Sequence, residues 1–236
     1  MAPEEFLSIE LKGLRHRYYH EQSGEFFELG PIDLRFVPGE VVFLVGGNGS
    51  GKTTLAKLIV GLYAPEAGEL LLDGVPVGDA SRDQYRQLFS TVFSDFHLFD
   101  DLLETGRPDL DAEGNRLLEK LHLHRKVRVQ DGAFTTKELS QGQRKRLALV
   151  AACLENRPFV VFDEWAADQD PAFKHFFYRQ VLPDLQAMGK TVLVISHDDR
   201  YFDVGDRVVR LESGKIVLEE RCKVTPEFPD RQMQAA

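Results

Sequence analysis

Apolar residues in this chain fall into short continuous runs separated by amphipathic stretches. The runs at 41–45 (VVFLV), 159–162 (FVVF) and 191–196 (TVLVIS) are typical of strands that are buried on both faces. One helix is predicted before the second run, at 142–155, and another between the second and third, at 171–188. This order predicts a parallel sheet with helices on its faces.

Other segments alternate apolar and polar positions, which predicts antiparallel hairpins. The hairpin segments are 6–19 with 26–37, 66–77, and 206–220 with a Ser-Gly turn. Asp73-Gly74 is the expected turn of the second hairpin. A short polar helix near 81–88 and an apolar strand around 89–93 follow it. The helix that begins near Lys52 is expected to end at Pro65 and Gly68.

The middle of the chain differs from both patterns. From about Leu98 to Glu138 no strongly apolar strand stands out, and leucines recur at helical spacing in NRLLEKLHLH. We therefore expect a single α/β domain over 1–236. Its core combines a mostly parallel sheet and flanking helices with an N-terminal antiparallel β-subdomain. The expected parts are the core at about 6–97 and 157–220, a small helical subdomain at about 98–156, and a disordered tail at 221–236.

Composition narrows the class of protein. The 236 residues are 43% hydrophobic and 28% charged, which is ordinary globular usage. The longest apolar runs are far shorter than the roughly 18 residues of a membrane span, and the acidic N-terminus is unlike a signal peptide, so a soluble, unexported chain is expected. A net charge of -9 argues against a nucleic-acid surface. Cys153 and Cys222 lie far apart in no zinc-like pattern, which suits a reducing compartment.

The segment GGNGSGKT at 46–53, here called the phosphate loop, fits the pattern G-x-x-x-x-G-K-[ST]. In that pattern, backbone N–H groups wrap nucleotide phosphates, Lys52 reaches the β- and γ-phosphates, and the Thr53 hydroxyl is a Mg²⁺ ligand. A plain glycine turn is the alternative, with a chance match of about one in a hundred at ordinary glycine usage. The nucleotide-binding residues expected here are Gly46, Gly47, Asn48, Gly49, Ser50, Gly51, Lys52, Thr53 and Thr54.

FVVFDE at 159–164 is an apolar run that ends in two acids. Ligands of open α/β sheets lie at the carboxyl ends of such strands, so Asp163 is expected where Mg²⁺ would be, as in a Walker B strand. Glu164 is placed to orient and polarise the water that attacks the γ-phosphate, as a general base. Two acids that only cap a strand end are the alternative, at roughly one chance in ten.

LSQGQRKR at 139–146, here called the signature segment, decides among the classes of phosphate-loop protein. It resembles the LSGGQ signature of the ATP-binding-cassette (ABC) family, with Gln141 in place of a glycine. The resemblance implies that Ser140, Gly142 and the backbone at the following helix start, including Gln141 and Gln143, contact the γ-phosphate of an ATP bound to a partner subunit. By itself the segment would be a helix start with serine as its cap.

Two more segments resemble the same family. ISHDD at 195–199 is similar to its switch loop, which implies that His197 contacts the γ-phosphate and links it to Glu164; a lone histidine after a strand would otherwise be incidental. AADQDP at 166–171 occupies the position of the D-loop, where Asp170 matches the family's aspartate. Asp170 is also suited to cap a helix that begins at a proline, and both roles are compatible.

An aromatic residue near the N-terminus and two further departures from the family pattern complete the comparison of motifs. Tyr18 matches the residue that stacks on adenine; Tyr19 is the competing choice, and a plain strand aromatic is as probable. Ser94, followed by Asp95, stands where the family has a Mg²⁺-binding glutamine that signals to the membrane domain. A serine hydroxyl or an aspartate oxygen could still reach the metal. Trp165 replaces the usual proline after the general base.

The resemblance covers about Phe6 to Glu220. FSTVFSDFHLFD, LSQGQRKRLAL and DEWAADQDP are similar to the ATP-binding half of bacterial exporters for cyclic or siderophore-type peptides, the pyoverdine and lasso-peptide exporter group. The implied protein is an ATP- and Mg²⁺-dependent ATPase with a P-loop NTPase core, which forms a head-to-tail homodimer when ATP binds. It would work at the cytoplasmic side of the inner membrane with a transmembrane domain, either in the same polypeptide or on another chain.

Two other classes of cassette remain as alternatives. A soluble ABC ATPase of DNA repair would need a long coiled coil, and one of translation usually has two cassettes; neither feature is found in the sequence. A regulatory cassette that does not hydrolyse ATP would not need the intact set of Lys52, Asp163, Glu164 and His197.

Overall fold

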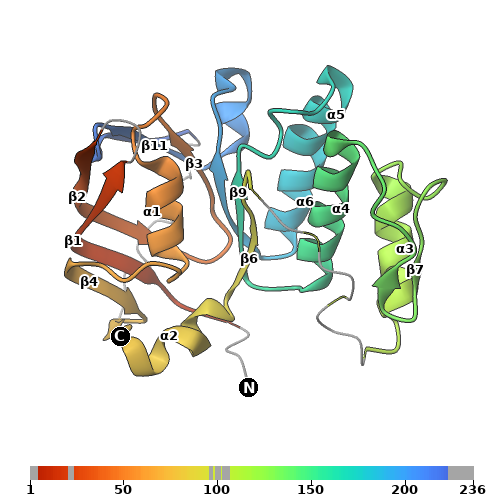
Figure 1. Ribbon diagram of the computed structural model, residues 1–236, viewed down its shortest axis with the longest axis horizontal. Helices are drawn as coiled ribbons and strands as arrows, with labels where there is room; N and C mark the ends of the chain where they lie inside the picture. The colour runs from red at the N-terminus through yellow and green to blue at the C-terminus, as the bar shows by residue number, and fades with distance from the viewer. Residues whose placement is uncertain (1–4, 21–23, 96–97, 99–101, 103–106, 223–236) are drawn as a thin grey trace, which may run out of the picture.

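A six-stranded sheet runs through the middle of the protein (Figure 1). This computed structural model describes residues 5–20, 24–95, 98, 102 and 107–222. The strand order is β12–β11–β3–β10–β9–β6. The strands are β3 (Val41–Val45), β6 (Phe89–Val92), β9 (Phe159–Asp163), β10 (Thr191–Ile195), β11 (Arg207–Glu212) and β12 (Lys215–Arg221). All neighbouring pairs are parallel except the β11–β12 hairpin, so the predicted mostly parallel sheet is confirmed.

The three central strands β3, β9 and β10 are buried at every position. Their side chains alternate between two cores. Val42 and Leu44 of β3 contribute to one core, and Val41, Phe43 and Val45 contribute to the other. Because both faces are covered, the sequence shows continuous apolar runs here, with no polar residue at alternate positions.

One face of the sheet is covered by helix α1 (Lys52–Ile59) and by a second, antiparallel sheet. The order of that sheet is β2–β1–β4–β5. Its strands are β1 (Ile9–His20), β2 (Glu25–Phe36), β4 (Ala67–Leu72) and β5 (Val75–Pro76). Asp73 and Gly74 form the predicted turn, and helix α2 (Asp79–Arg86) leads from this sheet to β6. The N-terminal antiparallel part is therefore confirmed.

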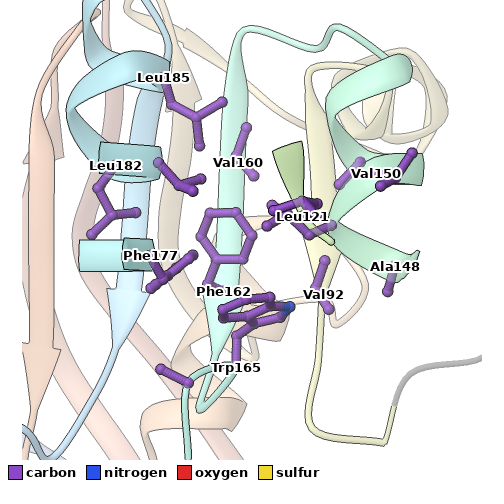
Figure 2. Packing of buried hydrophobic residues seen from close by; sticks show 14 of the residues in the cluster. Val92, Leu121, Ala148, Val150, Val160, Phe162, Trp165, Phe177, Leu182 and Leu185 are labelled. Carbon is purple, nitrogen blue, oxygen red and sulfur yellow. The ribbon is translucent and has the colours of Figure 1, made fainter. Parts of the chain in front are cut away.

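The other face is covered by helices α4 (Gln141–Leu154), α5 (Pro171–Phe176) and α6 (Leu182–Ala187), and helix α3 (Leu110–Lys120) packs against α4. Figure 2 shows Phe162 of β9 between Phe177 and Leu182 on one side and the α4 side chains on the other. The rings of Trp165 and Phe177 stack with centroids 4.3 Å apart. No helix in the described ranges has the length and apolar character needed to cross a bilayer.

The helix predicted at 171–188 is present but is not a regular α-helix throughout. A π-helical segment, Phe177–Val181, joins α5 to α6. Pro183 lies in the first turn of α6. A proline has no N–H, and its ring clashes with the carbonyl four residues before it, so the wider π turn accommodates it.

Some predicted boundaries were wrong. Helix α1 ends at Ile59, before Pro65 and Gly68, because Gly61 adopts a left-handed φ of 75°. The Gly61 and Leu62 amides then donate to carbonyls of the last turn, which completes a Schellman cap. Helix α2 is two residues earlier than predicted.

The middle of the chain, predicted to be helical, holds a short hairpin as well as α3. Its strands are β7 (Val129–Gln130) and β8 (Ala133–Phe134). The division into core, helical subdomain and tail remains a prediction. Most of the predicted tail, 223–236, lies outside the described residues, while Arg221 still belongs to β12.

Replacing Phe162 by alanine is expected to lower the free energy of unfolding by about 3–5 kcal/mol, because a fully buried ring would leave a cavity against Phe177 and Trp165. Urea unfolding monitored by circular dichroism measures this loss. Met188→Ala is the control, since that side chain is 64% exposed and should change stability by less than about 0.5 kcal/mol. Equal effects of the two substitutions would contradict the packing described above.

Candidate active site

Residues from four distant parts of the chain meet at one edge of the central sheet. Strands β3, β10, β9 and β6 are neighbours and run parallel, so their carboxyl ends lie together. The phosphate loop follows β3, His197 follows β10, and Ser94 follows β6. Asp163 ends β9 and Glu164 comes next. The structure thus brings these predicted residues to a common edge.

The phosphate loop has a backbone that only glycine can provide at two points. Gly46 has a φ of 152°, and a Cβ built on it would lie 2.1 Å from the Leu211 carbonyl oxygen. Gly51 has a φ of 101° and ends the loop directly before α1. The Ser50 hydroxyl oxygen is buried, and no described residue forms a hydrogen bond with it. A buried, unpaired hydroxyl beside a close-packed glycine turn fits a loop built to surround a polar group.

Lys52 is the cation of this loop. Its Nζ donates to the carbonyl oxygens of Gly46 at 3.0 Å and Gly47 at 2.9 Å. The residue is only 6% exposed. Burial lowers the pKa of Lys52, while the negative charges of Glu164 and Asp163 act in the opposite direction. An ammonium group held among backbone carbonyls, with little water, is suited to a phosphate oxygen.

Thr53 and Asp163 form the next pair of groups. Thr53 Oγ1 donates to Asp163 Oδ2 at 2.9 Å, and Asp163 is 1% exposed. Burial raises the pKa of Asp163, as do the charges of Glu164 and Asp95, while Thr53 and Lys52 lower it. A hydroxyl and a carboxylate side by side fit a Mg²⁺ ion, which binds few protein oxygens and completes its shell with phosphate oxygens and water. Thr54 follows in α1 and is half-buried.

Glu164 and His197 face each other at the ends of neighbouring strands. His197 Nε2 lies 3.2 Å from Glu164 Oε1, and both side chains are partly exposed. Glu164 has a left-handed φ of 51°, a conformation that costs energy for a residue with a side chain. A cleft of about 300 Å³ opens beside the pair. A carboxylate that is oriented by an imidazole and open to water can act as a general base.

The signature segment lies on a different face of the sheet from the phosphate loop. Helix α4 belongs to one hydrophobic core and α1 to the other, and Figure 1 shows the two helices on opposite sides of β9 and β6. Ser140 caps α4 in a capping box with Gln143. Gln141 Nε2 donates to Asp168 Oδ2 at 3.3 Å. Ser140, Gln141, Gly142 and Gln143 are therefore not brought to Lys52 within one chain.

Asp170 has the capping role that its sequence position suggested. Its Oδ1 accepts from the Phe173 amide at 2.9 Å, and its Oδ2 accepts from Arg146 at 2.7 Å. The Phe173 amide lowers the pKa of Asp170, and the Arg146 charge lowers it further. Contact with a partner subunit remains a prediction for this residue.

Tyr18 and Tyr19 of β1 point to opposite faces of the antiparallel sheet. The Tyr18 ring centroid is 5.1 Å from that of Phe27, and Phe27 lies against Gly51 at the end of the phosphate loop. Tyr19 instead contacts Phe26. Tyr18 is therefore the tyrosine on the side of the phosphate loop.

Ser94 lies in an exposed turn directly after β6. The carboxylate of its neighbour Asp95 is 4.0 Å from Lys57 Nζ on α1. The Asp95 charge also contributes to the raised pKa of Asp163, so Asp95 lies within electrostatic range of the metal position. The roles of both residues in metal binding remain predictions.

Two residues beside the site were missed or undervalued by the sequence analysis. Lys145 was not singled out, and Trp165 was noted only as a departure. Both are buried against the Glu164 turn. The run of three basic residues at 144–146, in a helix expected to be covered, was the available signal, because one of them had to face the interior.

Comparison with known proteins agrees with the geometry. The sequence model of the ABC transporter family matches residues 29–167. The chain belongs to this family. The ABC cassette is 53% identical over 221 residues to the ATP-binding protein SyrD of Pseudomonas syringae pv. syringae, across 92% of the cassette and 39% of SyrD. It is 35% identical over 206 residues to the ATP-dependent lipid A-core flippase of Chromobacterium violaceum, across 82% and 35% of the two chains. The cassette thus spans less than two fifths of the length of these relatives.

Solved structures share the fold of the cassette. The ATP-binding cassette MJ0796, in a dimeric post-hydrolysis state with ADP and Pi, matches 92% of this chain with a TM-score of 0.75 and 24% identity. A bacterial Atm1-family ABC exporter with ATP bound matches the same share with a TM-score of 0.74 and 22% identity. The predicted fold class is confirmed. As a member of the ABC transporter family, the cassette is an ATPase domain that binds ATP.

Proposed function

We propose that this cassette is the ATP-driven motor of an exporter that moves a peptide-type substrate, a cyclic peptide or siderophore, across the bacterial inner membrane. The convergence of Lys52, the Thr53–Asp163 pair and the Glu164–His197 pair at one sheet edge carries the motor function. The resemblance of the signature segment and its neighbours to peptide exporters supports the substrate class, and the similarity to a lipid A-core flippase supports work at a membrane.

In the proposed mechanism, residues 46–54 hold the phosphates of ATP through backbone N–H groups, the Lys52 cation and the α1 N-terminus. Thr53 and Asp163 would hold Mg²⁺, with Ser94 as a third ligand, and the bound ion would neutralise phosphate charge. Glu164 orients the attacking water and accepts a proton from it as the general base. His197 holds the Glu164 carboxylate in that position and reaches the γ-phosphate.

The two faces of the sheet suggest how the cassette works as a dimer. Since the signature segment and the phosphate loop lie on elements of opposite faces, two copies arranged head to tail would place each signature segment at the other copy's nucleotide. Ser140, Gln141, Gly142 and Gln143 would then contact that γ-phosphate, with Asp170 at the dimer contact. ATP stabilises the closed dimer because it binds that state more tightly than the open one, and hydrolysis removes this preference.

The transmembrane partner would lie in the same polypeptide or on another chain and hold the cassette at the cytoplasmic side of the membrane. The turn at Ser94 and Asp95 is suited to transmit closure. It follows β6, the edge strand of the six-stranded sheet, and Asp95 pairs with Lys57 of α1 at 4.0 Å.

A chimera tests this function: the cassette replaces the matching segment of SyrD in inside-out membrane vesicles. We expect ATP-dependent accumulation of a fluorescent cyclic peptide, and none with the Glu164→Gln chimera. Equal accumulation with the Glu164→Gln chimera would contradict the motor function. A chimera that hydrolyses ATP and accumulates neither would favour a cassette that is not coupled to transport.

Tyr18→Ala is expected to weaken ATP binding by about 5- to 150-fold, because stacking of a base on an aromatic ring contributes about 1–3 kcal/mol. Tyr19→Ala is the matched control and should stay within about twofold of the unmodified protein, since its ring faces away from the phosphate loop. Isothermal titration with ATP measures both affinities. A larger loss for Tyr19→Ala would reverse the assignment.

A further inference from the structure

Lys145 is a buried lysine in the second turn of α4. It is 3% exposed, although it carries a charge that is costly to remove from water. Its Nζ pairs with Asp168 Oδ2 at 2.7 Å and donates to the Glu164 carbonyl oxygen at 3.2 Å. Within the described residues, no hydrogen bond or ion pair of its side chain is with the phosphate loop or Asp163. The burial of this charged side chain is therefore not explained by direct binding of a nucleotide, and its bonds point to the turn after β9.

The Glu164 turn is fixed from several directions. The Glu164 amide donates to the Ile195 carbonyl at 3.1 Å, and its carbonyl accepts from the Ala167 amide at 3.1 Å as well as from Lys145. The next residue, Trp165, is 1% exposed and donates from Nε1 to the Lys145 carbonyl at 2.8 Å. Lys145 thus donates to the turn with its side chain and accepts from it with its backbone.

Neighbouring residues extend the same connection. Arg146 donates to Gln169 Oε1 at 2.9 Å, and Gln169 Nε2 donates to the Gly142 carbonyl at 3.1 Å. The Arg146 guanidinium also lies 3.5 Å from the centroid of the Phe173 ring. Several hydrogen bonds therefore join the start of α4 to the turn after β9.

A left-handed φ at a residue with a side chain persists only where its surroundings hold it. The φ of 51° at Glu164 turns its carboxylate toward His197. Small displacements of a reacting group reduce rates strongly: about 1 Å can cost 100-fold. The hydrogen bond from Lys145 is made to the carbonyl group of the same residue.

We propose that Lys145 is a positioning residue for Glu164: its ammonium group, anchored by Asp168, holds the Glu164 peptide and so sets the place of the general base. The inference rests on the proposed role of Glu164 in hydrolysis. It predicts an effect on turnover and none on nucleotide affinity, because no side-chain bond of Lys145 within the described residues is with the phosphate loop or Asp163. A merely structural role would change stability and leave turnover per folded chain unchanged.

Lys145→Met tests this role in the full chain. We expect kcat for ATP to fall about tenfold with KM for ATP within twofold, measured where the rate per chain no longer rises with protein concentration. Trp165 is the only tryptophan of the chain, so its fluorescence reports directly on the packing of this turn. Lys120→Met is the matched control: it breaks an exposed Lys–Asp pair between α3 and α6 and should leave kcat unchanged.

The outcomes distinguish a failure of the proposed function from a failure of the positioning role of Lys145. An unmodified protein without ATPase activity would overturn both the proposed function and this inference. An active protein whose Lys145→Met variant keeps the same kcat would overturn the positioning role alone. If Lys145→Met alters the Trp165 emission, Asp168→Asn decides, because it leaves the lysine in place. A several-fold lower kcat with unaltered emission then supports the proposal, and an unchanged kcat overturns it.

Discussion

Replacing Glu164 by glutamine is expected to lower the rate of ATP hydrolysis by about 10²- to 10⁴-fold while the affinity for ATP stays within about threefold. Glutamine keeps the shape of the side chain and can still lie beside His197, but it cannot accept a proton from water. The side chain at position 164 is partly exposed, so the amide group of the glutamine is not expected to disturb ATP binding. Phosphate release at saturating Mg-ATP measures the rate, and titration with ATP measures the affinity.

Glu119→Gln on the exposed surface of α3 is the control for this change. It removes the same charge far from the sheet edge and should leave hydrolysis unaffected. If the Glu164→Gln variant hydrolysed ATP as fast as the control, Glu164 could not be the general base, and the roles given to His197 and Lys145 would also fail.

Replacing Lys52 by methionine is expected to raise the dissociation constant for ATP by about 10- to 150-fold, since hydrogen bonds to a charged group contribute about 1.5–3 kcal/mol. Binding of polyphosphate depends on a cation that the loop already holds and partly desolvates. The fold should tolerate the change, because the Gly47 carbonyl also accepts from the Ser50 amide at 3.2 Å and a methionine occupies similar space. Of the two carbonyls that Lys52 contacts, only that of Gly46 then loses its partner among the described residues.

Lys57→Met is the matched control on the same helix. The Lys57 ammonium group pairs with Asp95, and within the described residues it forms no hydrogen bond or ion pair with the phosphate loop, so its loss should change ATP affinity by less than about threefold. Equilibrium binding of a fluorescent ATP analogue and thermal unfolding separate affinity from stability. Unchanged affinity in a folded Lys52→Met variant would rule out the phosphate loop as the main binding site.

Much of the fold could be predicted because its strands are buried on both faces. The runs at 41–45 and 159–162 admit no polar residue, so both the strands and the motifs at their ends could be placed from the sequence. The end of α1 was misplaced because two turn signals, Gly61 and Pro65, were close together. The nearer glycine caps the helix, since its left-handed backbone closes the last turn.

Other site residues could not be assigned from the sequence because their roles depend on the direction of their side chains. When two adjacent residues are alike, the hydrophobic periodicity does not show which of them faces the site. Tyr18 and Tyr19 are chemically equivalent in the sequence, and only the register of β1 against β2 places Tyr18 on the side of the phosphate loop. Lys145 was hidden for a similar reason. It is one of three consecutive basic residues, and its partner Asp168 is remote in sequence and comes close only when α4 packs against the turn after β9.

The most direct test of the central claim is the association state of the Glu164→Gln variant with and without Mg-ATP, measured by light scattering after size exclusion. A motor cassette that closes around ATP should elute as one chain without nucleotide and with doubled mass when Mg-ATP is present, because hydrolysis no longer reopens the dimer. A variant that binds ATP but keeps the mass of a single chain under both conditions would contradict the proposed ATP-driven closure.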